Sequence, residues 1–458
     1  MGRLLSILLL LPAASPHPGQ GASGDPLPAV GTVPATLREA RQIDPFYQKH
    51  LAVAGFPILG SVRVSDAALR EAAWILRHML AGRDDILAAL AANGVHLAVM
   101  AYTEYTTDVP EHRDMEPRIF WDRRARGLGG SPVSCAEENL LGFPGDPYAT
   151  ENILLHEFAH IVHGSALRTL DPTFDGRLGD AYRAALDQGL WEGTYAAVDC
   201  SEYWAEGVQS WFDDNRENDS LHNHVNTRAE LRAHDPTLAT LCAEVLGDGP
   251  WRYVKPARRA PADRAHLAEV DFGHLPRFVW REEPIPPRAR VLIQTRLGDI
   301  EVELDHEHAP RTVETFLHHV HQGFYSDGPV LRAFTADNQP GEVMPIVAIE
   351  VGADPARQGE LRPPIPLERT RDTGIRHQDG TLSMVRAGPD SAPERFLICL
   401  DDQPELDFGG RRHPDGQGSA AFGRVVTGMD VVRRIHALLA GGRELDPTLA
   451  IQRAIRRN

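Results

Sequence analysis

The sequence is poor in cysteine and in positive charge, and it lacks long hydrophobic runs. Its four cysteines include no Cys-x-x-Cys pair, which excludes a zinc ribbon or a thioredoxin motif. The pattern leaves open one disulfide among Cys135, Cys200 and Cys242, or free buried thiols. Lysine and arginine number 47 against 64 acidic residues, and the net charge of −17 argues against nucleic-acid binding. No stretch approaches the roughly 20 apolar residues that span a bilayer.

The overall composition of the chain is typical of a globular protein. The chain has 458 residues, of which 42% are hydrophobic and 24% are charged, and this length allows two or three domains. At the N-terminus, Arg3 is followed by the apolar run Leu4–Leu11 and by small residues. This order predicts a signal peptide over residues 1–22. We therefore expect a secreted or periplasmic protein with no membrane span.

Residues 156–160, His-Glu-Phe-Ala-His, form the most informative motif. Apolar residues recur around it at helical spacing, so His156 and His160 are expected on one face of a buried helix, where both can bind one zinc ion. Glu157 then lies beside the metal-bound water and can accept its proton. His163 lies one turn further on, and we expect it to support the site or to pack. It stands where the metzincin pattern requires glycine, which excludes that class.

A catalytic zinc site needs a third protein ligand, which we expect on a second helix over residues 201–212. Glu202 and Glu206 lie four residues apart there, among aromatic residues. Carboxylates on a largely apolar helix are costly unless they are paired or bind a metal. We expect Glu202 to be the third ligand and Glu206 to orient a ligating histidine. The alternative is that both belong to a solvated stripe.

These residues resemble the catalytic domain of the gluzincin peptidases related to anthrax lethal factor. In that family, a Glu-[Phe/Tyr]-[Phe/Trp]-Ala-Glu helix follows the first motif by about forty residues. Its first glutamate binds zinc, and a tyrosine seven residues earlier helps to stabilise the oxyanion. The matching positions here are Glu202 and Tyr195, although an ordinary core tyrosine remains the alternative for Tyr195. The resemblance implies a mainly α, α+β zincin-like metallopeptidase domain over residues 35–255, with Zn²⁺ as cofactor, that hydrolyses a peptide bond.

Residues 256–289 are rich in proline and arginine and are expected to form a linker. Short alternating strands and a proline-initiated helix follow. The motifs are the hairpin 291–304, the helix start at 309–317, and the segments 380–389 and 421–432. In this order they resemble cyclophilin-type peptidyl-prolyl isomerases. The resemblance implies an all-β, closed eight-stranded antiparallel barrel with two helices over residues 290–445, which makes the chain multi-domain.

The residues that match the isomerase site are largely changed. The family's Phe-His-Arg is Val330-Leu-Arg332 here, so only the catalytic-type arginine is kept. Ser-Gln-Phe-Phe is Glu394-Arg-Phe-Leu397, which keeps Phe396 but loses the glutamine and the phenylalanine of the proline pocket. Gln-Gly-Gly is replaced by Glu350-Val-Gly352. We expect weak or absent isomerase activity.

Two classes of function follow. The first is a secreted zinc peptidase, acting on a peptide or protein substrate, fused to a cyclophilin-like domain with an altered site. The second is a secreted peptidyl-prolyl isomerase, or a peptide-binding folding factor, in which the cyclophilin-like domain is the working part. A zinc-dependent binding protein without turnover is a third option.

Overall fold

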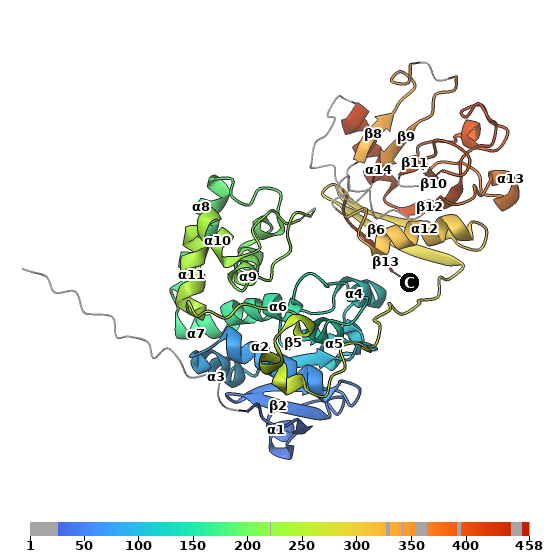
Figure 1. Cartoon of the computed structure of the whole chain (residues 1–458). Coiled ribbons are helices and arrows are strands. Elements are labelled where there is room, and N and C mark those ends of the chain that lie inside the picture. Colours follow the sequence, from blue (N-terminus) through green and yellow to red (C-terminus); the bar gives the residue numbers. More distant parts are fainter. Residues whose placement is uncertain are drawn as a thin grey trace, which may run out of the picture. The chain divides into compact units, whose positions relative to one another are not determined.

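The computed structural model describes most of the chain. The described residues are 26–219, 221–326, 330–340, 343–352, 364–391, 395–440 and 451–457. The predicted signal peptide lies outside them. The chain divides into two compact units (Figure 1). The first unit combines residues up to 102 with 128–217 and 223–276, and the second combines 103–127, 218–222 and residues from 277 onward.

The first unit contains a five-stranded sheet with the order β1-β2-β3-β4-β5. The strands are β1 (Gly31–Thr32), β2 (Lys49–Val53), β3 (Phe56–Gly60), β4 (Leu97–Met100) and β5 (Val133–Ala136). β2 and β3 form an antiparallel hairpin whose turn contains Gly55 at φ +79°, a conformation that favours glycine. β4 and β5 run parallel to β3, and all their residues are buried. Edge strand β5 contacts α6, the helix that carries the histidine motif.

Helices make up most of the rest of the first unit. They are α1 (Ala35–Arg41), α2 (Asp66–Met79), α3 (Asp84–Ala92), α5 (Glu137–Leu141), α6 (Ile153–Ile161), α7 (Arg168–Leu170), α8 (Phe174–Asp187), α9 (Cys200–Trp211), α10 (Arg228–His234) and α11 (Pro236–Leu246), with short turns η3 (Val162–Leu167), η4 (Tyr195–Ala197), η5 (Pro256–Arg258) and η6 (Pro261–Leu267). α10 and α11 are separate helices, because Asp235 caps α11 and Pro236 occupies its first turn.

Helices α6 and α9 lie against each other, and specific capping residues start both. The Asn152 side chain accepts a hydrogen bond from the Leu154 amide, and Asp199 accepts from the amides of Ser201 and Glu202. The buried Trp204 of α9 donates its indole N–H to the carbonyl of Ala159 in α6 at 3.0 Å. These contacts fix which faces of the two helices meet.

The second unit is built on an eight-stranded antiparallel sheet with the order β13-β6-β7-β12-β10-β11-β9-β8. The strands are β6 (Arg288–Thr295), β7 (Gly298–Asp305), β8 (Val330–Phe334), β9 (Ala348–Val351), β10 (Thr381–Met384), β11 (Phe396–Cys399), β12 (Ala421–Thr427) and β13 (Ile451–Arg456). The helices are α4 (Arg118–Arg124), α12 (Pro310–His321), α13 (Thr370–Thr373) and α14 (Met429–Ala440), with turns η1 (Thr106–Asp108), η2 (Pro110–His112) and η8 (Pro404–Leu406).

The expected closed barrel is wrong for the described part of this sheet. β8 pairs only with β9 there and β13 only with β6, so the sheet is a curled half-barrel with two edges. Helices pack against both edge strands, since α14 contacts β8 and α12 contacts β13 (Figure 1). Apolar side chains of both helices join the strands in one core, so the concave face is buried without closure.

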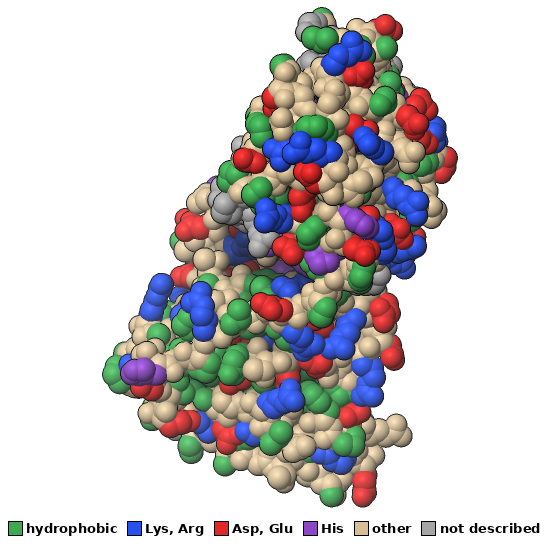
Figure 2. Space-filling view, turned by 90° about the vertical axis from the view of Figure 1, so that its right-hand side faces the viewer, with side chains coloured by type: hydrophobic (Ala, Val, Ile, Leu, Met, Phe, Trp, Pro, Cys, Tyr) green, Lys and Arg blue, Asp and Glu red, His purple; other side chains and the backbone are tan. Residues whose placement is uncertain are grey.

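The surface carries charges of both signs. On the face shown in Figure 2, basic and acidic side chains are interspersed, and no broad basic area stands out among the described residues. The helices of the described segments are all too short or too polar to cross a membrane.

Candidate metal centre

Helices α6 and α9 bring His156, His160 and Glu202 together. His156 Nε2 lies 3.1 Å from Glu202 Oε2, and His160 Nε2 lies 3.4 Å from the same oxygen. The two Nε2 atoms are 3.1 Å apart. One ligand atom from each of the three residues lies within 4.8 Å of the others. Two imidazoles and one carboxylate form a donor set that suits zinc, and the side chains converge as a metal site requires.

Tyr195 and Glu157 lie beside this group. The Tyr195 hydroxyl, from η4, donates a hydrogen bond to Glu202 Oε1 at 3.2 Å, and its ring lies 6.3 Å from that of His156. Glu157 is half-buried on α6, next to His156 in sequence. Gly129, from the glycine-rich loop before β5, lies so close that an added Cβ would be 3.0 Å from Glu157 Oε2. The site therefore holds an acidic group and a phenolic donor near the candidate ligands.

The charges around the imidazoles favour a cation. Burial alone would lower the pKa of His156, but the hydrogen bond with Glu202 and the charges of Glu157, Glu206 and Glu202 raise it to about 10. Burial raises the pKa of the Glu202 carboxyl, yet its hydrogen bonds with His156 and His160 bring that pKa well below its usual range. Burial raises the pKa of Glu157, against the opposing charges of the two histidines. Without a metal, a proton on His156 offsets the excess of carboxylates.

The outer nitrogens of both imidazoles have partners that sequence reasoning missed. Gln209 Oε1 lies 2.8 Å from His156 Nδ1, and Ser201 Oγ lies 2.7 Å from His160 Nδ1. Both partners come from α9, and Gln209 lies on the same helical face as Glu202, seven residues on. That spacing was the signal that could have identified it.

The two residues expected to support the site without binding metal lie differently. Glu206 Oε1 is 3.6 Å from His156 Nδ1, further away than Gln209. His163 lies in η3, where its Nε2 is 2.7 Å from Asp175 Oδ1 and its ring packs edge-on against Phe174. Of the two, only Glu206 therefore lies within ion-pair distance of a candidate ligand. The four cysteines are all free thiols, so no disulfide braces this region.

In the second unit, Arg332 lies on β8 beside a buried carboxylate. Its Nε donates to Glu350 Oε2 at 2.8 Å, and Arg395 Nη1 donates to Glu350 Oε1 at 2.8 Å. The Glu350 side chain is only 1% exposed, whereas that of Arg332 is 57% exposed. Arg332 also lies over the ring of Phe334, 4.1 Å from its centroid. The Arg332 side chain is therefore exposed to solvent and is held in position by its ion pair with Glu350.

Phe396, the other residue of the expected isomerase site, lies in the core. Its fully buried ring packs edge-on against Phe316 and Tyr325, with centroids 5.3 and 5.1 Å apart. Leu397 points to the other face of β11, where it joins a small apolar cluster with Phe334 and Leu406. Phe396 therefore stabilises the core of the sheet, and Leu397 is also buried, on the opposite face of β11.

Comparison with known proteins assigns the second unit to a protein family. The family model "Cyclophilin type peptidyl-prolyl cis-trans isomerase/CLD" matches residues 290–455. The chain is 35% identical over 148 residues to peptidyl-prolyl cis-trans isomerase A of Dickeya dadantii, which covers 32% of this chain and 70% of that protein. The chain belongs to the cyclophilin-type family. It is also 32% identical over 152 residues to cyp18 of Streptomyces antibioticus, covering 33% of this chain and 85% of the relative. Peptidyl-prolyl cis-trans isomerase B of Escherichia coli is 30% identical over 152 residues, with 33% and 86% covered.

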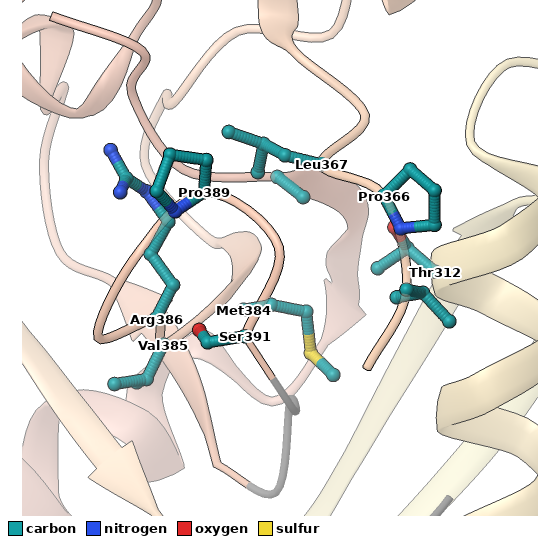
Figure 3. Close-up of a pocket in the computed structure, with 10 residues that line it drawn as sticks. Thr312, Pro366, Leu367, Met384, Val385, Arg386, Pro389 and Ser391 are labelled. Atoms are coloured by element: carbon teal, nitrogen blue, oxygen red, sulfur yellow. The ribbon is translucent and has the colours of Figure 1, made fainter. Parts of the chain in front are cut away.

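A small apolar cavity lies in this cyclophilin-type unit (Figure 3). Leu367, Pro366 and Pro389 surround it together with Met384 of β10 and Thr312 of α12. Its volume of about 20 Å³ is close to that of a single water molecule.

A buried Ser–His–Asp arrangement also lies in the cyclophilin-type unit. His377 Nδ1 is 2.8 Å from Asp407 Oδ1, and its Nε2 is 2.8 Å from Ser383 Oγ. Ser383 is fully buried and His377 is 2% exposed. Because a substrate cannot reach the hydroxyl there, the arrangement is a structural network that connects β10 to the segment after η8.

Proposed function

We propose that the first unit is a zinc-dependent peptidase, as its resemblance to gluzincins implies. The observation that carries the proposal is the convergence of His156, His160 and Glu202 from two separate helices. Metal analysis of the purified chain beside a digest of an unbiased peptide library tests it. We expect one zinc per chain and cleavage of peptide bonds. Zinc without cleavage would favour a zinc-dependent binding protein, and no zinc would contradict the proposal.

The residues of the chain have distinct roles in this proposal. His156, His160 and Glu202 would hold the ion, which when bound supplies the Lewis acidity that lowers the pKa of water and polarises a carbonyl. Glu157 accepts the proton of the attacking water and passes it to the leaving amine. The Tyr195 hydroxyl, now donating to Glu202, is placed to donate instead to the oxyanion that develops on the substrate.

The raised pKa of His156 predicts how zinc binding depends on pH. Below about pH 10 the metal-free imidazole keeps a proton that zinc must displace, because ligands bind deprotonated. Apparent zinc affinity should therefore rise about tenfold per pH unit between about pH 6 and 8. Competition with a chelator of known affinity at each pH measures this. A flat or falling affinity would contradict the charge balance described above.

Peptidyl-prolyl isomerisation by the second unit is the second candidate. Membership of the cyclophilin-type family favours it, as does the retained Arg332 on β8. An arginine stabilises the twisted amide of the transition state. We expect the activity to be weak, because Glu350 already engages this arginine and Leu397 replaces the phenylalanine of the family's proline pocket.

Replacing Arg332 by alanine tests this second candidate. If the unit isomerises prolyl bonds, the loss of one transition-state donor should lower the rate by about 10²-fold. A proline-isomerisation assay on the full chain measures it. Arg433→Ala is the matched control, because it removes a similarly exposed, ion-paired arginine of α14. Equal rates in wild type and Arg332→Ala would assign the unit to peptide binding instead.

Export completes the proposal. The N-terminal pattern of Arg3, an apolar run and small residues supports a secreted or periplasmic location. There the peptidase would meet peptide or protein substrates. Sequencing the N-terminus of the protein recovered from culture medium or periplasm tests it, and an intact Met1 would contradict it.

A further inference from the structure

Gln209 connects a candidate zinc ligand to a buried carboxylate. Its Oε1 lies 2.8 Å from His156 Nδ1, and its Nε2 donates to Glu151 Oε2 at 2.8 Å. Gln209 is fully buried and Glu151 is 4% exposed. The three side chains therefore form a hydrogen-bonded row, shielded from solvent, that ends at the candidate metal centre.

The order of the groups in this row sets its direction. The amide N–H of Gln209 donates to Glu151, and this leaves the carbonyl oxygen of Gln209, which can only accept, facing His156. His156 Nδ1 must then carry the hydrogen that Gln209 accepts. The neutral imidazole consequently keeps its lone pair on Nε2, the atom that lies 3.1 Å from Glu202.

Other contacts hold this row in place, and the nearby acid Glu206 lies further from the imidazole than Gln209 does. Glu151 is anchored through its backbone carbonyl, which accepts from Lys255 Nζ at 2.7 Å and from Asn139 Nδ2 at 2.9 Å. Glu206 lies 3.6 Å from His156 Nδ1, and its other oxygen accepts from Asn215 Nδ2 at 3.0 Å. Gln209 is therefore the direct partner of the imidazole.

We infer that Glu151 and Gln209 are positioning residues that hold His156 in the tautomer that binds zinc through Nε2. This inference rests on the proposed function, because it assigns to the row a task at the proposed zinc site. Residues that orient a ligating histidine typically change metal affinity by about 10–100-fold when they are replaced.

Zinc titrations of the full chain against a competing chelator test the row. Gln209→Leu should bind zinc about 10–100-fold more weakly. Gln209→Glu should also bind more weakly, because it puts a second carboxylate against Glu151. The exchange variant Gln209→Glu/Glu151→Gln should recover most of the affinity, since the new carboxylate accepts from His156 Nδ1 and the new amide donates to it.

Controls separate this role from folding and from the proposed function. Gln188→Leu replaces an exposed glutamine of the same unit and should leave affinity unchanged, and metal-free unfolding temperatures identify variants that fold poorly. Wild-type affinity in Gln209→Leu, or an exchange variant no better than Gln209→Glu, would overturn the inference. If the wild-type chain binds zinc but cleaves no peptide, the proposed peptidase function is contradicted, whereas the inferred role of Glu151 and Gln209 is not. A wild-type chain that takes up no zinc would overturn both.

Discussion

Replacing Glu157 by glutamine is expected to lower peptide hydrolysis by about 10²–10⁴-fold, the usual contribution of a general base. The amide cannot accept a proton from water, yet it has nearly the same size and leaves the three candidate ligands in place. Zinc content should therefore stay at the wild-type level. The measurement is the rate of cleavage of a peptide selected from the library digest, with zinc quantified in the same samples.

The control for this variant is Glu244→Gln, which neutralises a carboxylate of α11 that is 47% exposed. Its rate should match that of wild type. Glu157→Gln with full hydrolytic activity and full zinc content would contradict the assignment of the base, and with it the proposed peptidase. Loss of both zinc and activity would instead mean that Glu157 helps to build the site.

Replacing Gly129 by alanine is also expected to lower activity strongly, although Gly129 is not one of the candidate metal ligands. The added Cβ would lie 2.7 Å from His160 Cβ and 2.8 Å from His160 Cδ2. His160 Cβ is attached to the backbone of α6, so relief requires the loop or the helix to move. Overpacking of this kind costs about 1–3 kcal/mol, and a shift of about 1 Å at a reacting centre can cost about 10²-fold in rate.

Gly130→Ala is the matched control for this prediction. A Cβ at residue 130 meets only the carbonyl oxygen of Pro132, at an ordinary contact distance of 3.7 Å. Zinc affinity, cleavage rate and the free energy of unfolding should fall for Gly129→Ala and stay near wild type for Gly130→Ala. Equal behaviour of the two variants would show that the loop does not restrict the position of His160.

Much of the candidate metal centre is readable from local patterns. The spacing of His156 and His160 places both on one face of α6, because the helical period alone decides that. The costly carboxylates among aromatic residues pointed to α9, and Tyr195 followed from the family pattern seven residues before Glu202. The cyclophilin-type unit was equally readable, because its motifs follow one another in order over residues 291–432, within the residues 290–455 that the family model matches.

Other features depend on contacts between segments that are distant in sequence. Only the folded chain sets Gly129, in the loop before β5, against His160 of α6. Gln209 and Glu151 are 58 residues apart, and their hydrogen bond exists only because α9 packs beside the start of α6. The resemblance implied an antiparallel barrel, and the pairing is antiparallel, but the expected closure is wrong for the described sheet, because closure depends on whether edge strands β8 and β13 meet.

The sequence by itself determined which side chains share a helical face and which family the second unit belongs to, because both are encoded in short-range spacing and ordered motifs. The tertiary structure alone decided which groups orient the imidazoles, how closely the glycine-rich loop approaches them, and that Glu350 engages Arg332. The physical reason is that hydrogen-bond partners and close contacts depend on distances of a few ångströms between separate elements, and packing of the whole unit sets those distances.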